Sequence, residues 1–138
     1  MTCPAMSIEM VQPAQRMSMN DRLHWRAQRR LTRAWRTAAY TFALSQLGRA
    51  PSERRRPPCF VRVEFPVPDP GRRRDPHNTA PTVKAIIDGL VDAGVWPDDT
   101  DEFVIVVDPR FYKPIDGPFQ MAPVRVHLTE RTGDLPNA

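Results

Sequence analysis

The sequence lacks the features that mark several large classes of protein. Its two cysteines, Cys3 and Cys59, lie far apart and outside any Cys-x-x-Cys pattern, so neither a zinc site nor a disulfide framework is expected. It has no run of about 18 apolar residues, and residues 1–15 have no basic start followed by an apolar run. We therefore expect no membrane span and no signal peptide, and a cytoplasmic protein.

Lysine is also scarce. Only Lys84 and Lys113 are lysines, so arginine supplies almost all of the 20 basic residues, which face 16 acidic residues and leave a formal charge of +4. The planar guanidinium group suits bidentate contact with phosphate. A basic balance is typical of nucleic-acid-binding proteins, but solubility alone also accounts for it, so composition does not choose between the two.

The pattern of apolar residues predicts one α+β domain. The 138 residues fit a single domain, and the 16 prolines cluster mainly in residues 1–15, 51–81 and 109–123, so regular structure should lie mostly between those stretches. Periodicity predicts an edge strand at 7–11, a helix at 22–47, a strand at 59–67, a helix at 81–93, a central strand at 103–107 and a last strand at 124–128. We expect a two-layer fold in which two main helices pack on one mixed β-sheet.

The first predicted helix carries a stripe of arginines. Asn20 or Asp21 would cap its start, and Gly48 would end it. At 100° per residue its arginines fall within roughly 120° of arc, opposite an apolar face. The stripe consists of Arg22, Arg26, Arg29, Arg30, Arg33 and Arg36. Two interpretations stay open: a solvated charged face, or a face for phosphates, which the scarcity of acidic partners favours.

Three tryptophans raise the same kind of choice. Trp35 lies on the apolar face of the first helix and is expected in the core. Trp96 lies beside a cluster of aspartates and is expected to pack beneath them. Trp25 falls between the two helix faces, where it would either stack on an unpaired base or pack in the core or in a dimer interface. His24 and His127 are expected to be structural or exposed.

The densest signal lies in residues 72–101. A basic turn, Arg72, Arg73 and Arg74, ends in Asp75, and His77 and Asn78 follow. A helix then carries Lys84 and Asp88 four positions apart, and the next turn presents Asp98, Asp99 and Asp101. Carboxylates beside arginines and a lysine suit metal-assisted hydrolysis of a phosphodiester, because Mg²⁺ binds oxygen ligands and activates water. Ordinary turn chemistry accounts for the same aspartates, so both interpretations remain.

The segment resembles the signature of the RusA family of Holliday junction resolvases. That signature has a basic run, Asp-x-Asp-Asn, a lysine, a helix reading roughly Ala-x-x-Asp-x-Leu, and a Gly-x-x-x-Asp-Asp turn. This sequence has RRRDPHN, Lys84, AIIDGL and GVWPDD in the same order. The segment from Asn20 to Trp25 also resembles the start of the family's first helix, and the similarity spans about residues 18–128.

The resemblance implies roles for individual residues. Asp75 and Asp99 correspond to the family's metal-binding and catalytic aspartates, and Lys84 corresponds to its catalytic lysine. Three extra residues separate Lys84 from the motif of Asp75. Asn78 holds the motif's asparagine position, and with the arginines of residues 72–74 and of the first helix it would contact DNA. The implied cofactor is Mg²⁺, with Mn²⁺ as the alternative.

His77 departs from the family pattern, because the second aspartate of the motif would stand there. Imidazole suits Mn²⁺ better than Mg²⁺. Three explanations compete: His77 is a ligand or general base in a variant site, Asp88 or Glu64 supplies the missing carboxylate, or catalysis is weakened or lost.

The function implied by the resemblance is a metal-dependent endodeoxyribonuclease. It would resolve Holliday junctions or other branched DNA in recombination and repair, as family members do in bacteria and their viruses. A homodimer is implied, because two sites must cut paired strands. We expect an N-terminal segment at 1–17, the nuclease domain at 18–128 and a flexible tail at 129–138. A RusA-like protein that binds branched DNA with weakened or lost cleavage is the alternative.

Overall fold

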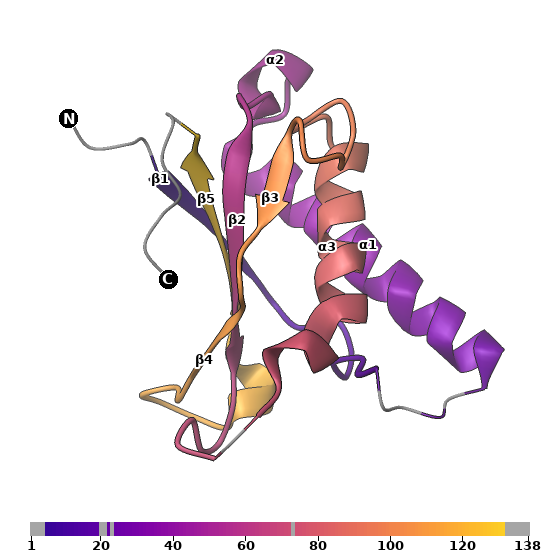
Figure 1. Cartoon of the computed structure of the whole chain (residues 1–138), viewed down its shortest axis with the longest axis vertical. Coiled ribbons are helices and arrows are strands. Elements are labelled where there is room, and N and C mark those ends of the chain that lie inside the picture. Colours follow the sequence, from indigo (N-terminus) through magenta and orange to yellow (C-terminus); the bar gives the residue numbers. More distant parts are fainter. Residues whose placement is uncertain (1–4, 20–21, 23, 73, 132–138) are drawn as a thin grey trace.

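A five-stranded mixed sheet carries both long helices on one of its faces (Figure 1). The computed structural model describes residues 5–19, 22, 24–72 and 74–131. Within them the strands are β1 (Ala5–Met10), β2 (Cys59–Pro66), β3 (Val104–Val106), β4 (Arg110–Tyr112) and β5 (Val124–Glu130). The helices are α1 (Trp25–Leu47), α2 (Pro51–Arg54) and α3 (Ala80–Asp92), with 3-10 turns η1 (Pro76–Thr79) and η2 (Phe119–Met121). The predicted two-layer α+β fold is confirmed.

Strand β2 lies at the centre of the sheet. It pairs antiparallel with β5, which in turn pairs antiparallel with β1. On its other side β2 pairs parallel with β3 and, further along, with β4. Alternate residues of β2 point to opposite faces, as predicted: Val61, Val63 and Phe65 are buried in the core, whereas Arg62 and Glu64 are only partly buried.

The two long helices cross at very short range. A Cβ atom added at Gly89 of α3 would lie 2.3 Å from the carbonyl oxygen of Arg36 and 2.7 Å from the Cβ of Ala39 in α1. Only a residue without a side chain therefore fits at this crossing. The buried residues of α1 recur every four positions, as expected for one face of a helix: Trp35, Ala39, Ala43 and Leu47.

The first ten residues of α1 include none of the buried residues of the helix. The earliest is Trp35, and Figure 1 shows the start of the helix projecting past α3. The helix begins at Trp25, three residues later than predicted, and the side chain of His24 caps it by accepting a hydrogen bond of 3.2 Å from the backbone N–H of Arg26. The expected caps, Asn20 and Asp21, lie outside the described residues.

Several boundaries differ from those predicted. Residues 49–58, expected to be a loop, contain α2, and β4 was not predicted. β1 pairs along its whole length with β5 and buries Ile8 and Met10, so this part of the N-terminal segment belongs to the domain. β5 continues to Glu130, past the expected boundary at residue 128. Residues 132–138 of the expected tail lie outside the described residues. No described helix is long and apolar enough to cross a bilayer.

Candidate functional site

Lys84 and Asp99 meet at the first half of α3. The Lys84 Nζ donates to Asp88 Oδ1 at 2.9 Å, one helical turn along, and also donates to Asp99 Oδ2. Asp88 and Asp99 therefore bind the same ammonium group, although they come from a helix and from the turn that follows it. The sequence indicated each of the three residues, and the fold brings them together.

The turn that presents Asp99 is held by buried contacts. Gly94 adopts φ +80°, a left-handed conformation that ends α3 and starts the turn. Trp96 is buried, as expected, and its Nε1 donates to the Pro57 carbonyl at 3.1 Å. The Asp98 carboxylate accepts from the backbone N–H of Asp99 at 2.7 Å. These contacts fix the start of the turn, so Asp99 is presented from a well-defined backbone.

Lys84 and Asp99 line a cleft of about 320 Å³ between α3, η1 and the edge strand β3, here named the Lys84 cleft. His77 and Asp108 also line it. Hydrogen bonding to Asp99 and then to Asp88 raises the pKa of Lys84 above its ordinary value. The hydrogen bond from Lys84 lowers the pKa of Asp99, so this carboxyl stays ionised well below neutral pH.

Asp75 lines a neighbouring cleft of about 310 Å³, here named the arginine cleft because Arg16, Arg72 and Arg74 also line it. The Asp75 carboxylate accepts from the backbone N–H of His77 at 3.0 Å and thereby caps η1. Asn78 belongs to the same cleft. Thr79, which is buried, belongs to the walls of both clefts. Asp75 and Asp99 thus lie in adjacent clefts, and their convergence on one ion stays a prediction.

The carboxylates near Lys84 fit a metal site that uses one or two protein ligands, and not a site that needs three or more. Among the described residues, no group of three or more His, Cys, Asp or Glu side chains is arranged to hold a metal ion. Mg²⁺ commonly binds to only one or two protein carboxylates and keeps several waters. Asp88 and Asp99, which share one ammonium group, form such a pair of oxygen donors. His77 is exposed and lines the same cleft as Asp99.

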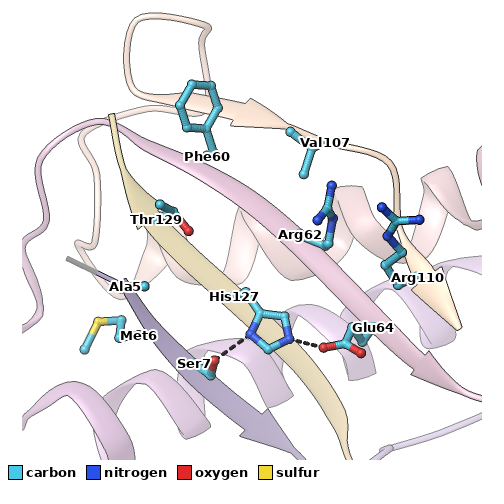
Figure 2. A pocket seen from close by; sticks show the side chains of 10 residues that line it. All are labelled: Ala5, Met6, Ser7, Phe60, Arg62, Glu64, Val107, Arg110, His127 and Thr129. Atoms are coloured by element: carbon cyan, nitrogen blue, oxygen red, sulfur yellow. Dashed lines mark hydrogen bonds and ion pairs between the residues drawn. The ribbon is translucent and has the colours of Figure 1, made fainter. Parts of the chain in front are cut away.

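Glu64, the other candidate for the missing carboxylate, lies on the open face of the sheet. The Glu64 side chain hydrogen-bonds the Nε2 atom of His127. The Nδ1 atom of the same histidine lies 2.6 Å from the Ser7 Oγ (Figure 2). The three residues line a pocket with Arg62 and Arg110. Glu64 lines neither the Lys84 cleft nor the arginine cleft. The geometry therefore favours Asp88 over Glu64 as the additional carboxylate, and His127 is partly exposed, as expected.

The predicted arginine stripe is exposed, but its first member, Arg22, lies ahead of α1 and not on the helix. Arg36 forms a two-pronged ion pair with Asp92 of α3, with distances of 2.5 and 2.8 Å. The other five arginines, all exposed, form no ion pair with a described residue: Arg22, Arg26, Arg29, Arg30 and Arg33. Arg36 is therefore the member of the stripe whose charge is already neutralised within the protein.

Trp25 does not pack in the core of the chain, which corrects one of the expectations for it. Its side chain is 55% exposed. The guanidinium groups of Arg26 and Arg29 lie 5.2 and 5.7 Å from its ring centroid, and the ring of His24 lies beside it. The helix starts so late that Trp25 stands ahead of its first buried turn, which leaves base stacking and dimer packing as its two interpretations.

Comparison with known proteins assigns no family. No family model matches the sequence, and no curated protein is significantly similar to it.

Proposed function

We propose that the protein is a metal-dependent endodeoxyribonuclease that cuts Holliday junctions or other branched DNA. One observation carries the proposal: Lys84 and Asp99, fifteen positions apart and singled out separately in the sequence, meet in one cleft beside a second cleft lined with arginines. A cutting site needs acidic groups for a metal and a cation for the phosphate, and here both lie next to further cations for the DNA backbone.

Within this proposal, Asp99 is the carboxylate that holds the metal ion, with Asp88 beside it and Asp75 across Thr79. A bound Mg²⁺ or Mn²⁺ would polarise the scissile phosphate and lower the pKa of the attacking water. The Lys84 side chain is 62% exposed, so its ammonium group can turn from the carboxylates to stabilise the charge that develops on the phosphate. His77, which lines the same cleft as Asp99, would serve as a ligand or as a general base.

The exposed arginines of α1 supply the binding half of the function. They would contact the DNA backbone without reading its sequence, because guanidinium groups on one helix face match phosphates rather than base edges. Symmetric cutting of a junction needs two sites, so the proposal includes a homodimer. Light scattering on the purified protein should then give twice the mass of one chain.

The direct test is cleavage of a synthetic four-way junction. Purified protein is incubated with labelled junction, or with linear duplex of the same sequence, in Mg²⁺, in Mn²⁺ and in EDTA. We expect paired nicks in the junction with either metal and none in EDTA, and little cutting of linear duplex. A protein that binds the junction tightly and nicks it in neither metal would contradict the nuclease proposal.

A second candidate is a RusA-like protein that binds branched DNA and does not cut it. Two observations favour it: His77 replaces the expected aspartate, and the described residues contain no group of three metal donors. Tight junction binding without nicks would support this candidate. Weak DNA binding that does not change with salt would contradict both candidates, since each relies on contacts with phosphate.

A further inference from the structure

The arginine cleft is built from three parts of the chain. Arg16 comes from the connection between β1 and α1, Arg72 and Arg74 come from the turn after β2, and Phe111 comes from β4. Nothing in the sequence singled out Arg16, which stands alone in a stretch without periodicity. Three arginines face one acid in this cleft, Asp75, so its charge is strongly positive.

The guanidinium group of Arg16 lies in an environment that disfavours its positive charge. It is partly buried, and its guanidinium group lies 5.3 Å from the ring centroid of Phe65 and 5.6 Å from that of Phe111. The guanidinium group of Arg74 contacts the same Phe111 ring at 5.7 Å. Burial and then the charge of Arg74 lower the pKa of Arg16. Two cations gathered around one ring are stabilised when an anion joins them.

No carboxylate of the described residues pairs with these cations. Among the described residues, Arg16 and Arg72 form no side-chain hydrogen bond and no ion pair. The Asp75 carboxylate is bound to the backbone N–H of His77 and pairs with neither of them. One guanidinium nitrogen of Arg74 donates to the backbone carbonyls of Asp69 and Arg72. Its other guanidinium nitrogens form no hydrogen bond with a described residue. The unused donors of three guanidinium groups therefore line one cleft.

We propose that the arginine cleft binds a phosphate group of the DNA backbone, with Arg16 as one of its ligands. Phosphate has several acceptor oxygens, which suits donors that converge from different segments, and guanidinium groups match it in pairs. A phosphate bound here lies across Thr79 from the Lys84 cleft, so this contact would position the strand for cutting next door. That the phosphate group belongs to DNA rests on the proposed function. That the cleft binds a phosphate group does not.

The experiment uses two variants of the cleft and one matched control in the full chain. Arg16→Ala removes the buried ligand. Arg72→Ala removes an exposed ligand whose side chain forms no hydrogen bond or ion pair with a described residue, so we expect folding to stay intact. Arg55→Ala is the control, because Arg55 is also exposed, its side chain forms no hydrogen bond or ion pair with a described residue, and it lies at the α2 end, opposite β4 (Figure 1).

Affinity for a labelled four-way junction is measured over a range of salt concentrations by fluorescence anisotropy, without metal. We expect Arg16→Ala and Arg72→Ala each to bind roughly tenfold more weakly, as loss of a charged hydrogen bond implies. Each should also reduce the slope of log affinity against log salt by about 1, because one phosphate contact is lost. Arg55→Ala should match the wild type. Junction affinity and salt slope that are unchanged in both cleft variants would overturn the proposal.

A second arm identifies the source of the phosphate. Inorganic phosphate is titrated into the protein while the side-chain Nε–H signals of arginine are followed by NMR, and we expect the signals lost in Arg16→Ala and Arg72→Ala to be those that shift. A shift without any effect of the variants on junction affinity would overturn DNA as the ligand. Nicking is not read in either arm, so a protein that fails to cut but loses affinity in both variants leaves this site standing while the nuclease proposal falls.

Discussion

The two clefts share a wall at Thr79 and differ in how their charges are balanced. At the Lys84 cleft, one ammonium group bonds two carboxylates, those of Asp88 and Asp99, so each charged group has a partner within the protein and one negative charge is left over. In the arginine cleft, three guanidinium groups face the single carboxylate of Asp75, and that carboxylate is bonded to backbone.

The difference in charge balance indicates that the two clefts have different roles. A cluster of mutually bonded side chains is held in place before a ligand arrives, and a remaining negative charge favours a cation, which suits groups that must be positioned for metal-assisted chemistry. A cleft with unpaired cations gains most from an incoming anion, which suits groups that hold DNA. We infer that the carboxylates of the two clefts, Asp99 and Asp75, serve cutting, and that the arginines of the arginine cleft, with the arginine stripe, hold the DNA.

Removing a carboxylate from either cleft should have the largest effect. Asp99→Asn or Asp75→Asn should reduce junction cutting by more than about 100-fold and leave junction affinity intact, because the metal loses a charged ligand while the phosphate contacts stay. Gel assays of cutting, with anisotropy for binding, would check this. Asp101→Asn is the matched control, since its carboxylate lies in the same turn and bonds no described residue.

If Asp99→Asn stops cutting and Asp75→Asn does not, the site is confined to the Lys84 cleft, and Asp75 only caps η1. Normal cutting by both variants would mean that neither cleft holds the chemistry.

Reversing charges on α1 should have the next largest effect. Arg29→Glu combined with Arg33→Glu should weaken binding to junction, fork and linear duplex about equally, by at least tenfold at moderate salt, because contacts with phosphate carry no information on DNA shape. Arg36→Ala should change affinity much less, because Asp92 already neutralises that arginine, and should lower the free energy of unfolding by at most about 1 kcal/mol. If the double variant and the wild type bind DNA with equal affinity, the stripe is a solvated charged face and does not bind DNA.

The smallest effect concerns the ionisation of Asp99. Its folded-state pKa is lowered by Lys84, so the stabilisation from this pair is present above the ordinary aspartate value and is lost as pH falls through the lowered one. Lys84→Met should raise the pKa of Asp99 back toward its ordinary value, which a ¹³C NMR titration of the carboxyl carbon would measure. A pKa that does not move in this variant would show that Lys84 does not hold Asp99.

Much of the fold follows from periodicity. Alternation of apolar and polar residues predicted a strand at 59–67, where β2 forms, and apolar periodicity predicted a helix at 81–93, where α3 forms. The details that failed depend on context. His24 caps α1 although its residue type is an uncommon cap, and β4 has only three residues and gains its pairing from β2.

The candidate site was predictable in part. Lys84, Asp88 and Asp99 stood out because charged groups bracket an apolar helix, and the fold gathers the two carboxylates around the ammonium group of Lys84. Arg16 could not be found in this way, because it is a single arginine between β1 and α1 and forms no sequence pattern with other residues. Its role depends on Phe65 and Phe111, which are distant in the chain and meet it only through β2 and β4. The environment of Trp25 stayed open for a similar reason: its exposure depends on where the core begins beneath α1.

The central claim is that Asp75 and Asp99, on either side of Thr79, serve one divalent ion, and paramagnetic broadening by Mn²⁺ tests it most directly. Substoichiometric Mn²⁺ is added to ¹⁵N-labelled protein, and the loss of each backbone amide signal is measured. The account predicts that the signals of Asp75, His77 and Asp99 vanish first, and that Asp99→Asn weakens this effect at all three. Broadening that is centred on the Glu64 face of the sheet, or that spares either aspartate, would contradict it.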